Sequence, residues 1–415
     1  MDIVGDRMAE KVENPSLPHA ERPIKGTTFI RTCFNGLNAL SGVGILSIPF
    51  ALSQGGWLSL CLLVVISVLC CYTGLLLQLC MGSHPSVKTY PDIGELAFGR
   101  AGRALVCFFM YLELYLVAVE FLILEGDNLE KLFPQTVFNI HGLRINGKQG
   151  FVLLSALVIW PTTWLRSMGA LAYVSASGCL ASVILVFCVL WVGAGDGVGF
   201  HEKGTLVDWA GLPTSISLYT FCYCGHAVFP TLCNSMKDRS RFSRVLLVCF
   251  ITSTINYGTM AVLGYLMYGD GIKSQVTLNL PTGKLASKLA IYTTLINPFA
   301  KYAVMINPIA TAIESAGPFG ESRWVGIVIR TVVLIGTVIV ALCMPFFGEV
   351  MAFTGAFLSV TVSIVLPCVC YLRISKGRSR KCGAERMVII GIVVVGVFVG
   401  VVGTFSSLRQ IIRRL

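Results

Sequence analysis

The sequence predicts an all-α membrane protein that crosses the bilayer eleven times. Hydrophobic residues make up 55% of the 415 residues, charged residues make up only 13%, and the mean hydropathy is +0.77. A soluble domain has no core large enough to bury so much apolar side chain. The apolar residues come in runs that suit membrane helices, which need about 20 residues each. These runs cover residues 29–52, 57–81, 104–124, 150–165, 169–192, 212–233, 244–268, 286–313, 325–345, 349–372 and 387–408.

Composition also excludes several classes of partner and cofactor. The formal charge of +11 comes from Lys and Arg residues in short loops between apolar runs, and no nucleic-acid-binding motif accompanies them. The sixteen cysteines lie mostly inside apolar runs, without the loop spacing of a disulfide framework or a zinc site. We therefore expect a membrane protein with no nucleic-acid partner and no bound metal.

The chain divides into one long membrane domain and two short tails. Residues 1–26 are polar, contain three prolines and lack the apolar core of a signal peptide, so we expect a disordered cytosolic tail. Residues 27–410 form the transmembrane domain, and residues 411–415 form a short C-terminal tail. A cytosolic N-terminus places about 19 basic residues inside and about 10 outside, as the positive-inside rule favours. The basic residues Arg409, Arg413 and Arg414 argue for the opposite orientation.

Two of the apolar runs are interrupted in the middle. The first contains Ser41-Gly42-Val43-Gly44, and the sixth contains Cys222-Tyr223-Cys224-Gly225-His226. Glycine disfavours the helical conformation. Main-chain groups without helical hydrogen bonds are tolerated inside a membrane only where other parts of the protein bury them or where they line a polar cavity. Two breaks half a chain apart indicate inverted repeats made of spans one to five and six to ten, with the eleventh span outside them.

Such breaks suit a zwitterionic solute. The second half of a broken helix presents free N–H groups with partial positive charge, and the first half presents free carbonyls with partial negative charge. A carboxylate would bind the amides of Gly42, Val43, Gly44 and Ile45, and an ammonium would face carbonyls near Asn38 and Ser41 or near Phe221 and Cys222. Small residues also let membrane helices pack closely, so helix packing is the alternative. The substrate-site candidates are Asn38, Ser41, Gly42, Val43, Gly44, Ile45, Phe221, Cys222, Tyr223 and Gly225.

Ionisable residues within the apolar runs are candidates for ion coupling. A charge at mid-membrane costs about 2.5 to 3.5 kcal/mol on insertion scales. Glu113 and Glu120 lie seven residues apart on one face of the third run, and either can carry a proton or pair with a neighbouring base. His226 stands beside the second break, where it is either a pH switch or a hydrogen-bonded packing residue.

The motifs around the breaks resemble a known superfamily. The stretch Asn35–Ala51, together with Gly55-Gly56-Trp57, Tyr90–Gly94 and Cys224–Pro230, is similar to the amino acid/auxin permeases. Within that superfamily the chain looks most like the plant vacuolar amino acid transporters, relatives of the vesicular inhibitory amino acid transporter. The resemblance implies a leucine-transporter-like core, a vacuolar membrane, an amino acid substrate, and a proton as the coupling ion with no other cofactor. The N-terminal tail is shorter than in many relatives.

The same resemblance implies a role for Lys301. In related folds a sodium ion links the eighth span to the first, and the ammonium of Lys301, within the eighth run, can stand in for that ion. The alternatives are an amine that reaches the membrane surface and a plain structural ion pair.

The sequence thus predicts a transporter that works by alternating access, and it leaves antiport and symport open. The alternatives are a sodium-coupled plasma-membrane carrier and an amino acid sensor without net transport. An enzyme is disfavoured, because the chain has no His-rich metal cluster, no Gly-x-Ser-x-Gly motif and no phosphate-binding loop. The expected partners are the amino acid substrate and the lipid bilayer, and the sequence leaves an obligate protein partner open.

Overall fold

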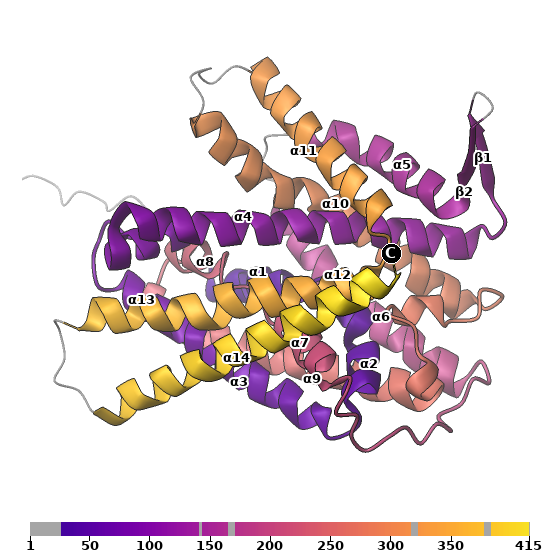
Figure 1. The fold of residues 1–415 in the computed structure, drawn as a ribbon, viewed down its shortest axis with the longest axis horizontal. Coiled ribbons are helices and arrows are strands. Elements are labelled where there is room, and N and C mark those ends of the chain that lie inside the picture. The colour runs from indigo at the N-terminus through magenta and orange to yellow at the C-terminus, as the bar shows by residue number, and fades with distance from the viewer. Residues whose placement is uncertain (1–25, 141–142, 165–170, 317–322, 377–382, 415) are drawn as a thin grey trace, which may run out of the picture.

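The protein is an elongated bundle of helices (Figure 1). The computed structural model describes residues 26–140, 143–164, 171–316, 323–376 and 383–414, so the expected tail of residues 1–26 lies almost wholly outside the described residues. The α-helices are α1 Phe29–Leu40, α2 Gly44–Gly55, α3 Ser59–Met81, α4 Tyr90–Leu132, α5 Gly147–Ile159, α6 Leu171–Ala194, α7 Leu212–Cys222, α8 Phe229–Ser235, α9 Phe242–Tyr268, α10 Leu285–Ala316, α11 Arg323–Cys343, α12 Phe347–Phe353, α13 Leu366–Ser375 and α14 Gly383–Arg414.

Each apolar run of the sequence coincides with a helix or a pair of helices. Among the described residues, seven helices are long and apolar enough to cross a membrane, or eight if the bent pair α1 and α2 counts as one span. The chain is therefore a polytopic membrane protein. Three runs fall short. Helix α5 continues into the 3-10 turn Trp160–Trp164, α7 is separated from α8 by residues 223–228, and α6 counts only as the shorter apolar helix Gly178–Ala194.

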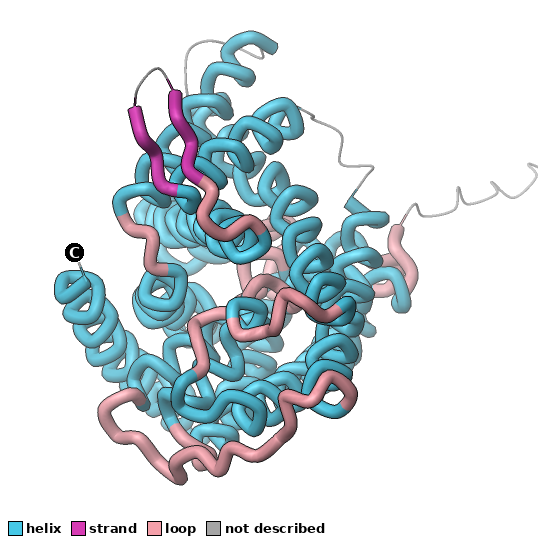
Figure 2. The backbone as a smooth tube through the Cα atoms, turned by 90° about the vertical axis from the view of Figure 1, so that its right-hand side faces the viewer, coloured by secondary structure: helices cyan, strands magenta, loops and turns pink. Residues whose placement is uncertain are grey.

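Two elements differ from the sequence prediction. The all-α prediction misses a small antiparallel hairpin of β1 Val137–Ile140 and β2 Leu143–Asn146, which stands at the edge of the bundle (Figure 2). Phe138 of this hairpin packs edge to face on Phe151 of α5, at 5.3 Å between ring centroids, so the strand pair is anchored by an aromatic contact. Helix α4 is also much longer than the run 104–124, because Thr89 forms a capping box with Asp92 and Gly99 carries the helix through a kink at φ 67°.

The tenth run contains a second local departure from ideal helix. Between α12 and α13 the chain forms π-helical turns over Thr354–Ser359 and Thr361–Val365. Such turns occur often at functional sites, because they widen the helix and turn side chains toward a neighbour. Here they turn two hydroxyl groups toward α4: Ser359 Oγ donates to Glu113 at 2.6 Å, and Thr354 Oγ1 donates to Glu120 at 2.8 Å.

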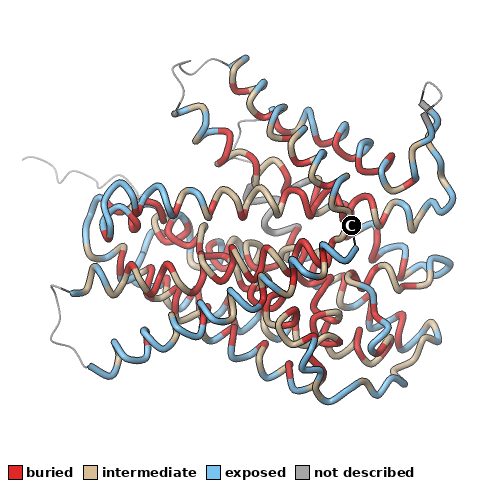
Figure 3. Tube along the Cα trace, in the orientation of Figure 1, coloured by how far each residue is buried: buried red, intermediate tan, exposed pale blue. Residues whose placement is uncertain are grey.

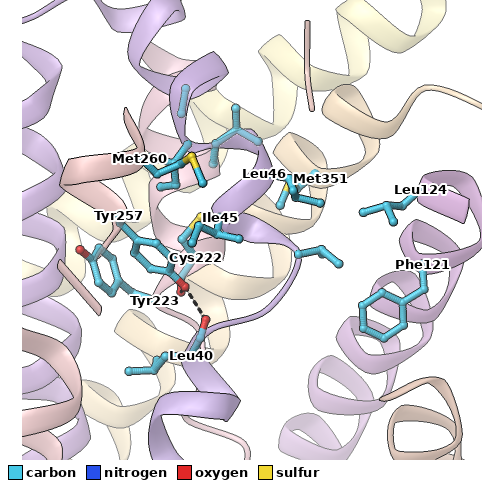
Figure 4. Close-up of a cluster of buried hydrophobic side chains, with 14 of the residues drawn as sticks. Leu40, Ile45, Leu46, Phe121, Leu124, Cys222, Tyr223, Tyr257, Met260 and Met351 are labelled. Atoms are coloured by element: carbon cyan, nitrogen blue, oxygen red, sulfur yellow. Dashed lines mark hydrogen bonds between the residues drawn. The ribbon is translucent and has the colours of Figure 1, made fainter. Parts of the chain in front are cut away.

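The two broken helices lie at the centre of the bundle, where most residues are buried (Figure 3). Helices α1 and α2 meet at an angle of 52°. Helix α2 packs along α7, while α1 and α2 also pack along α9. Helix α9 supplies Tyr257, which is fully buried and whose hydroxyl donates to the carbonyl of Leu40 and lies 3.2 Å from that of Cys222 (Figure 4). One side chain thus contacts carbonyls at both breaks.

We predict that Tyr257→Phe destabilises the protein by about 1 to 3 kcal/mol, because the buried carbonyl of Cys222 loses its side-chain donor and that of Leu40 keeps only the N–H of Gly42. The matched control is Tyr268→Phe on the same helix, since the buried hydroxyl of Tyr268 has no hydrogen-bond partner among the described residues. Thermal unfolding of the detergent-solubilised protein should show a lower Tm for the first variant only. Equal Tm values for the two variants would contradict this role of Tyr257.

Candidate functional site

A cavity of about 220 Å³ lies between the two helix breaks. It is large compared with the roughly 10 to 15 Å³ that one water molecule needs on this measure, so it has room for a small organic solute. Helices α1, α2, α4, α7, α8 and α10 all contribute to its wall. The predicted site residues that line it are Asn38, Gly42, Val43, Gly44, Phe221, Cys222, Gly225, Glu113 and Lys301.

The first break offers N–H groups to this cavity. Helix α1 ends at Leu40 and α2 begins at Gly44, and the N–H groups of Val43, Gly44 and Ile45 have no backbone acceptor among the described residues. They form the positive end of a twelve-residue helix, which is a ready site for an anionic group.

The glycines of the first break have different surroundings. A Cβ atom added to Gly42 would meet no atom within 4 Å, so this residue leaves the main chain open to the cavity. A Cβ atom added to Gly44 would lie 2.6 Å from Cys222 Sγ and 3.3 Å from its Cα, so this glycine allows α2 and α7 to touch.

Lys301 places a positive charge on the other side of the same break. Its side chain is only 5% exposed, and its ammonium donates to the carbonyl of Ser41 at 3.0 Å and to that of Asn38 at 3.3 Å. These carbonyls form the negative end of α1, so the charge of Lys301 and the helix dipole attract each other. The carbonyls near Asn38 and Ser41, expected to face a substrate ammonium, therefore face a lysine of the protein itself.

Glu113 provides the acidic group of the cavity wall. It is 6% exposed, and one of its oxygens accepts hydrogen bonds from Ser359 Oγ at 2.6 Å and from Cys224 Sγ at 3.0 Å. Ser363 in turn donates to Cys224 Sγ at 2.9 Å. The cavity thus carries one carboxyl group on α4 and one ammonium group on α10. The wall near Glu113 is otherwise apolar and includes Leu114, Val117, Phe121, Val304 and Met305.

Five predicted residues lie outside this cavity wall. Ser41 contributes only its carbonyl to Lys301, and Ile45 lines a separate, smaller cavity between α2, α6 and α10. The other three turn toward neighbouring helices. The hydroxyl of Tyr223 donates to Thr254 at 2.9 Å, and Glu120 accepts a hydrogen bond from Thr354. The ring of His226 contacts Thr73 Oγ1 at 2.9 Å and the carbonyl of Cys70 at 3.1 Å.

The sequence analysis missed residues that complete the site. Tyr257 lies in an apolar run whose composition gives no sign of a contact with both breaks. Ser359 is one of several serines in the tenth run, and only the π-helical turn brings it to Glu113. Cys224 belongs to the second break, but its bond to Glu113 follows from the packing of α4.

A solute-sized cavity at two breaks in buried membrane helices defines a transport or solute-binding protein of the membrane. The chain belongs to the family described as transmembrane amino acid transporter protein, whose sequence profile matches residues 25–410. It is thus an integral multi-pass membrane protein of a transporter family, not an enzyme.

Its relatives in Arabidopsis thaliana carry the same description. The chain is 54% identical to amino acid transporter AVT1I over 391 residues, which cover 94% of this chain and 96% of that protein. It is 49% identical to amino acid transporter AVT1J over 97% of this chain and 96% of the relative. It is 46% identical to amino acid transporter AVT1B, with 94% of this chain and 72% of that protein covered. The resemblance inferred from the motifs is therefore confirmed.

The two glycines of the first break allow a matched test. We predict that Gly44→Ala lowers the Tm, because its methyl group meets Cys222, whereas Gly42→Ala retains the Tm, because its methyl group has room. Gly42→Ala should instead weaken amino acid binding about tenfold or more, since the methyl group occupies the approach to the main chain. Thermal unfolding with and without amino acids measures both effects, and a Gly42→Ala protein with unchanged binding would contradict the site.

Proposed function

We propose that this protein is a secondary active transporter that exchanges protons for amino acids across the vacuolar membrane by alternating access. The observation that carries this proposal is the convergence of three charged features on one cavity: the N-terminus of α2, the ammonium of Lys301 and the carboxyl of Glu113. A zwitterion complements them, and the relatives are named as amino acid transporters.

The architecture we propose has eleven spans, with two five-span repeats of opposite orientation and one additional helix, α14. The helix contacts support this architecture, because contacts made by spans of one repeat are matched by contacts of the corresponding spans of the other repeat. Helix α9 packs on α1 and α2, and correspondingly α3 packs on α7 and α8. Helix α4 packs on α5 as α10 packs on α11, and α6 packs on α10 as α13 packs on α4.

In the pose we propose, the substrate carboxylate binds the free N–H groups of Val43 and Gly44, with the ammonium of Lys301 nearby. The substrate ammonium faces Glu113. The carbonyls of the second break are less available, because that of Phe221 accepts from the N–H of Cys224 at 3.1 Å and that of Cys222 lies on Tyr257. The apolar wall around Leu114, Val117 and Phe121 then receives the substrate side chain.

Proton exchange follows from this pose. A deprotonated Glu113 attracts the substrate ammonium, whereas a protonated Glu113 is neutral and has lost that attraction. The carboxyl therefore holds either a proton or the substrate ammonium, and this mutual exclusion couples inward movement of one to outward movement of the other. Glu120 is less suited to this role, because it is fully buried and lies outside the cavity wall.

Lys301 supports coupling to protons in place of sodium. Its ammonium already occupies the carbonyls of Asn38 and Ser41, at which a sodium ion would otherwise have to bind. It joins the eighth span to the first with a positive charge of the protein itself, so no second cation is needed there.

The structure corresponds to a state open toward the end of the bundle where α1 begins. The cavity extends along α1 to Asn35 and along α8 to Leu232. Its other end is closed by the buried segment around Gln275, which donates to Asp127 at 2.8 Å, while Ser47 donates to the carbonyl of Ser274 at 2.6 Å. With a cytosolic N-terminus this is the inward-facing state, and opening to the lumen requires these bonds to separate.

Uptake into reconstituted vesicles tests the proposed function. A panel of labelled amino acids should accumulate when a pH gradient is imposed, and a sodium gradient should have no effect. Sodium-driven uptake would establish the sodium-coupled alternative, and binding without uptake would establish a sensor.

For the proton step, we predict that amino acid binding to the wild-type protein weakens by up to tenfold per pH unit as acid protonates Glu113. In Glu113→Gln the carboxyl is absent, so binding should be weaker and independent of pH. The control is Glu130→Gln, an exposed carboxyl on the same helix, which should behave as wild type. Isothermal titration across a pH series measures the effect, and a pH-dependent Glu113→Gln protein would exclude this residue.

For the cation step, we predict that Lys301→Ala reduces transport at least tenfold, because the carbonyls of Asn38 and Ser41 lose their buried partner. Lys288→Ala, which removes an exposed lysine from the same helix, should leave transport unchanged. Initial uptake rates in vesicles at several pH values provide the measurement. A Lys301→Ala protein with the wild-type rate and pH dependence would remove this residue from the mechanism.

A further inference from the structure

A second, larger hollow lies away from the transport site. It has a volume of about 860 Å³ and is formed where the end of α3, the start of α9, the end of α13 and the start of α14 meet. Figure 1 shows α13 and α14 diverging toward this end of the bundle. We refer to this hollow as the α3–α14 groove.

The walls of the α3–α14 groove change in character along its length. Apolar side chains of Leu75 and Leu79 on α3 face Leu372 on α13 and Ile389 on α14. Toward the helix ends the lining becomes polar, with Gln78, Ser83, Ser243 and Ser375. An occupant that suits both parts has an apolar portion and a polar portion.

The polar end of the groove is strongly basic. Lys376 and Arg386 line it, and both are exposed. The turn that carries Arg239 is joined to α3, because Gln78 Nε2 donates to the carbonyl of Arg239 at 3.3 Å. Exposed Arg244 and Arg373 lie beside the lining residues in sequence.

The acidic groups at this end are engaged by other residues. Glu385, which itself lines the groove, accepts a hydrogen bond from Tyr371 at 3.1 Å and offsets one of the two lining positive charges, while Asp238 pairs with Arg241 at 3.0 Å. The described residues therefore leave an excess of positive charge at the polar end of the groove.

We propose that the α3–α14 groove binds an anionic phospholipid from the leaflet at the N-terminal end of the bundle. The phosphate-bearing headgroup lies between Lys376 and Arg386, and the upper part of the acyl chains lies along Leu75, Leu79 and Ile389. Basic pockets between membrane helices are suited to such headgroups, because each basic group near the surface adds to the attraction. A free phosphate would use the basic residues and leave the apolar wall unfilled, so the lipid is the better match.

The lipid also has a mechanical consequence. Helix α3 packs against α7 and α8, which line the transport cavity, whereas α13 packs against α4. A lipid wedged between α3, α13 and α14 therefore contacts helices of both repeats and stabilises one arrangement of them.

The test measures lipid binding directly, so it does not depend on whether the protein transports amino acids. Wild-type protein and a Lys376→Gln/Arg386→Gln double variant are purified from the same membranes, and native mass spectrometry records the phospholipid that each retains. We expect wild type to retain phosphatidylinositol or phosphatidylglycerol, and the double variant to lose affinity about fivefold for each basic group removed. Lys288→Gln, an exposed lysine outside this groove, is the matched control and should retain lipid as wild type does.

Several outcomes would overturn the proposal. Equal retention of anionic lipid by wild type and the double variant would show that the lipid is attracted to the basic protein surface as a whole and not to this groove. Equal retention of phosphatidylcholine and anionic lipid by wild type would show a purely apolar groove. Displacement of the lipid by inorganic phosphate at low concentration would show a phosphate site. Unchanged Tm values of the variants provide the check on folding.

Discussion

The structure depends on how the main-chain groups exposed at two breaks in the membrane interior are satisfied. A carbonyl left unpaired at such depth costs several kcal/mol, so an interrupted helix persists only with donors from neighbouring helices. Tyr257 supplies a hydroxyl to Leu40 and Cys222, and Lys301 supplies an ammonium to Asn38 and Ser41. With the carbonyls engaged in this way, the N–H groups at the start of α2 remain for a ligand.

The contacts that stabilise the two breaks also determine the shape of the binding cavity. The side chains that stabilise the breaks come from α9 and α10, so the geometry of the binding cavity is set by how those helices pack on α1 and α2. On the opposite wall, Glu113 is oriented by Ser359 and Cys224, which come from the tenth run and the second break. Movement of any of these helices changes the partners of a buried charge. The exchange of a proton for a solute requires a change of this kind.

Much of this could be predicted from the sequence, because it depends on local composition. Apolar runs located the helices, although α4 extends well beyond its run at both ends, and Gly42 and Gly44 located the first break. Lys301 and Glu113 were conspicuous because charges are rare in apolar runs. What could not be predicted depends on contacts between distant segments: the π-helical turns that bring Ser359 to Glu113, the reach of Tyr257 to both breaks, and the turning of Glu120 and His226 away from the cavity. The β-hairpin was missed because its strands are only four residues long and are stabilised by packing on α5.

A high-resolution density map of the protein with a bound amino acid tests the central claim most directly. We predict density for the ligand between the two breaks, with its carboxylate at the N–H groups of Val43 and Gly44 and its ammonium at Glu113, while Lys301 remains on the carbonyls of Asn38 and Ser41. A continuous helix through residues 41–43, or an amino acid bound with its ammonium in place of that of Lys301, would contradict it.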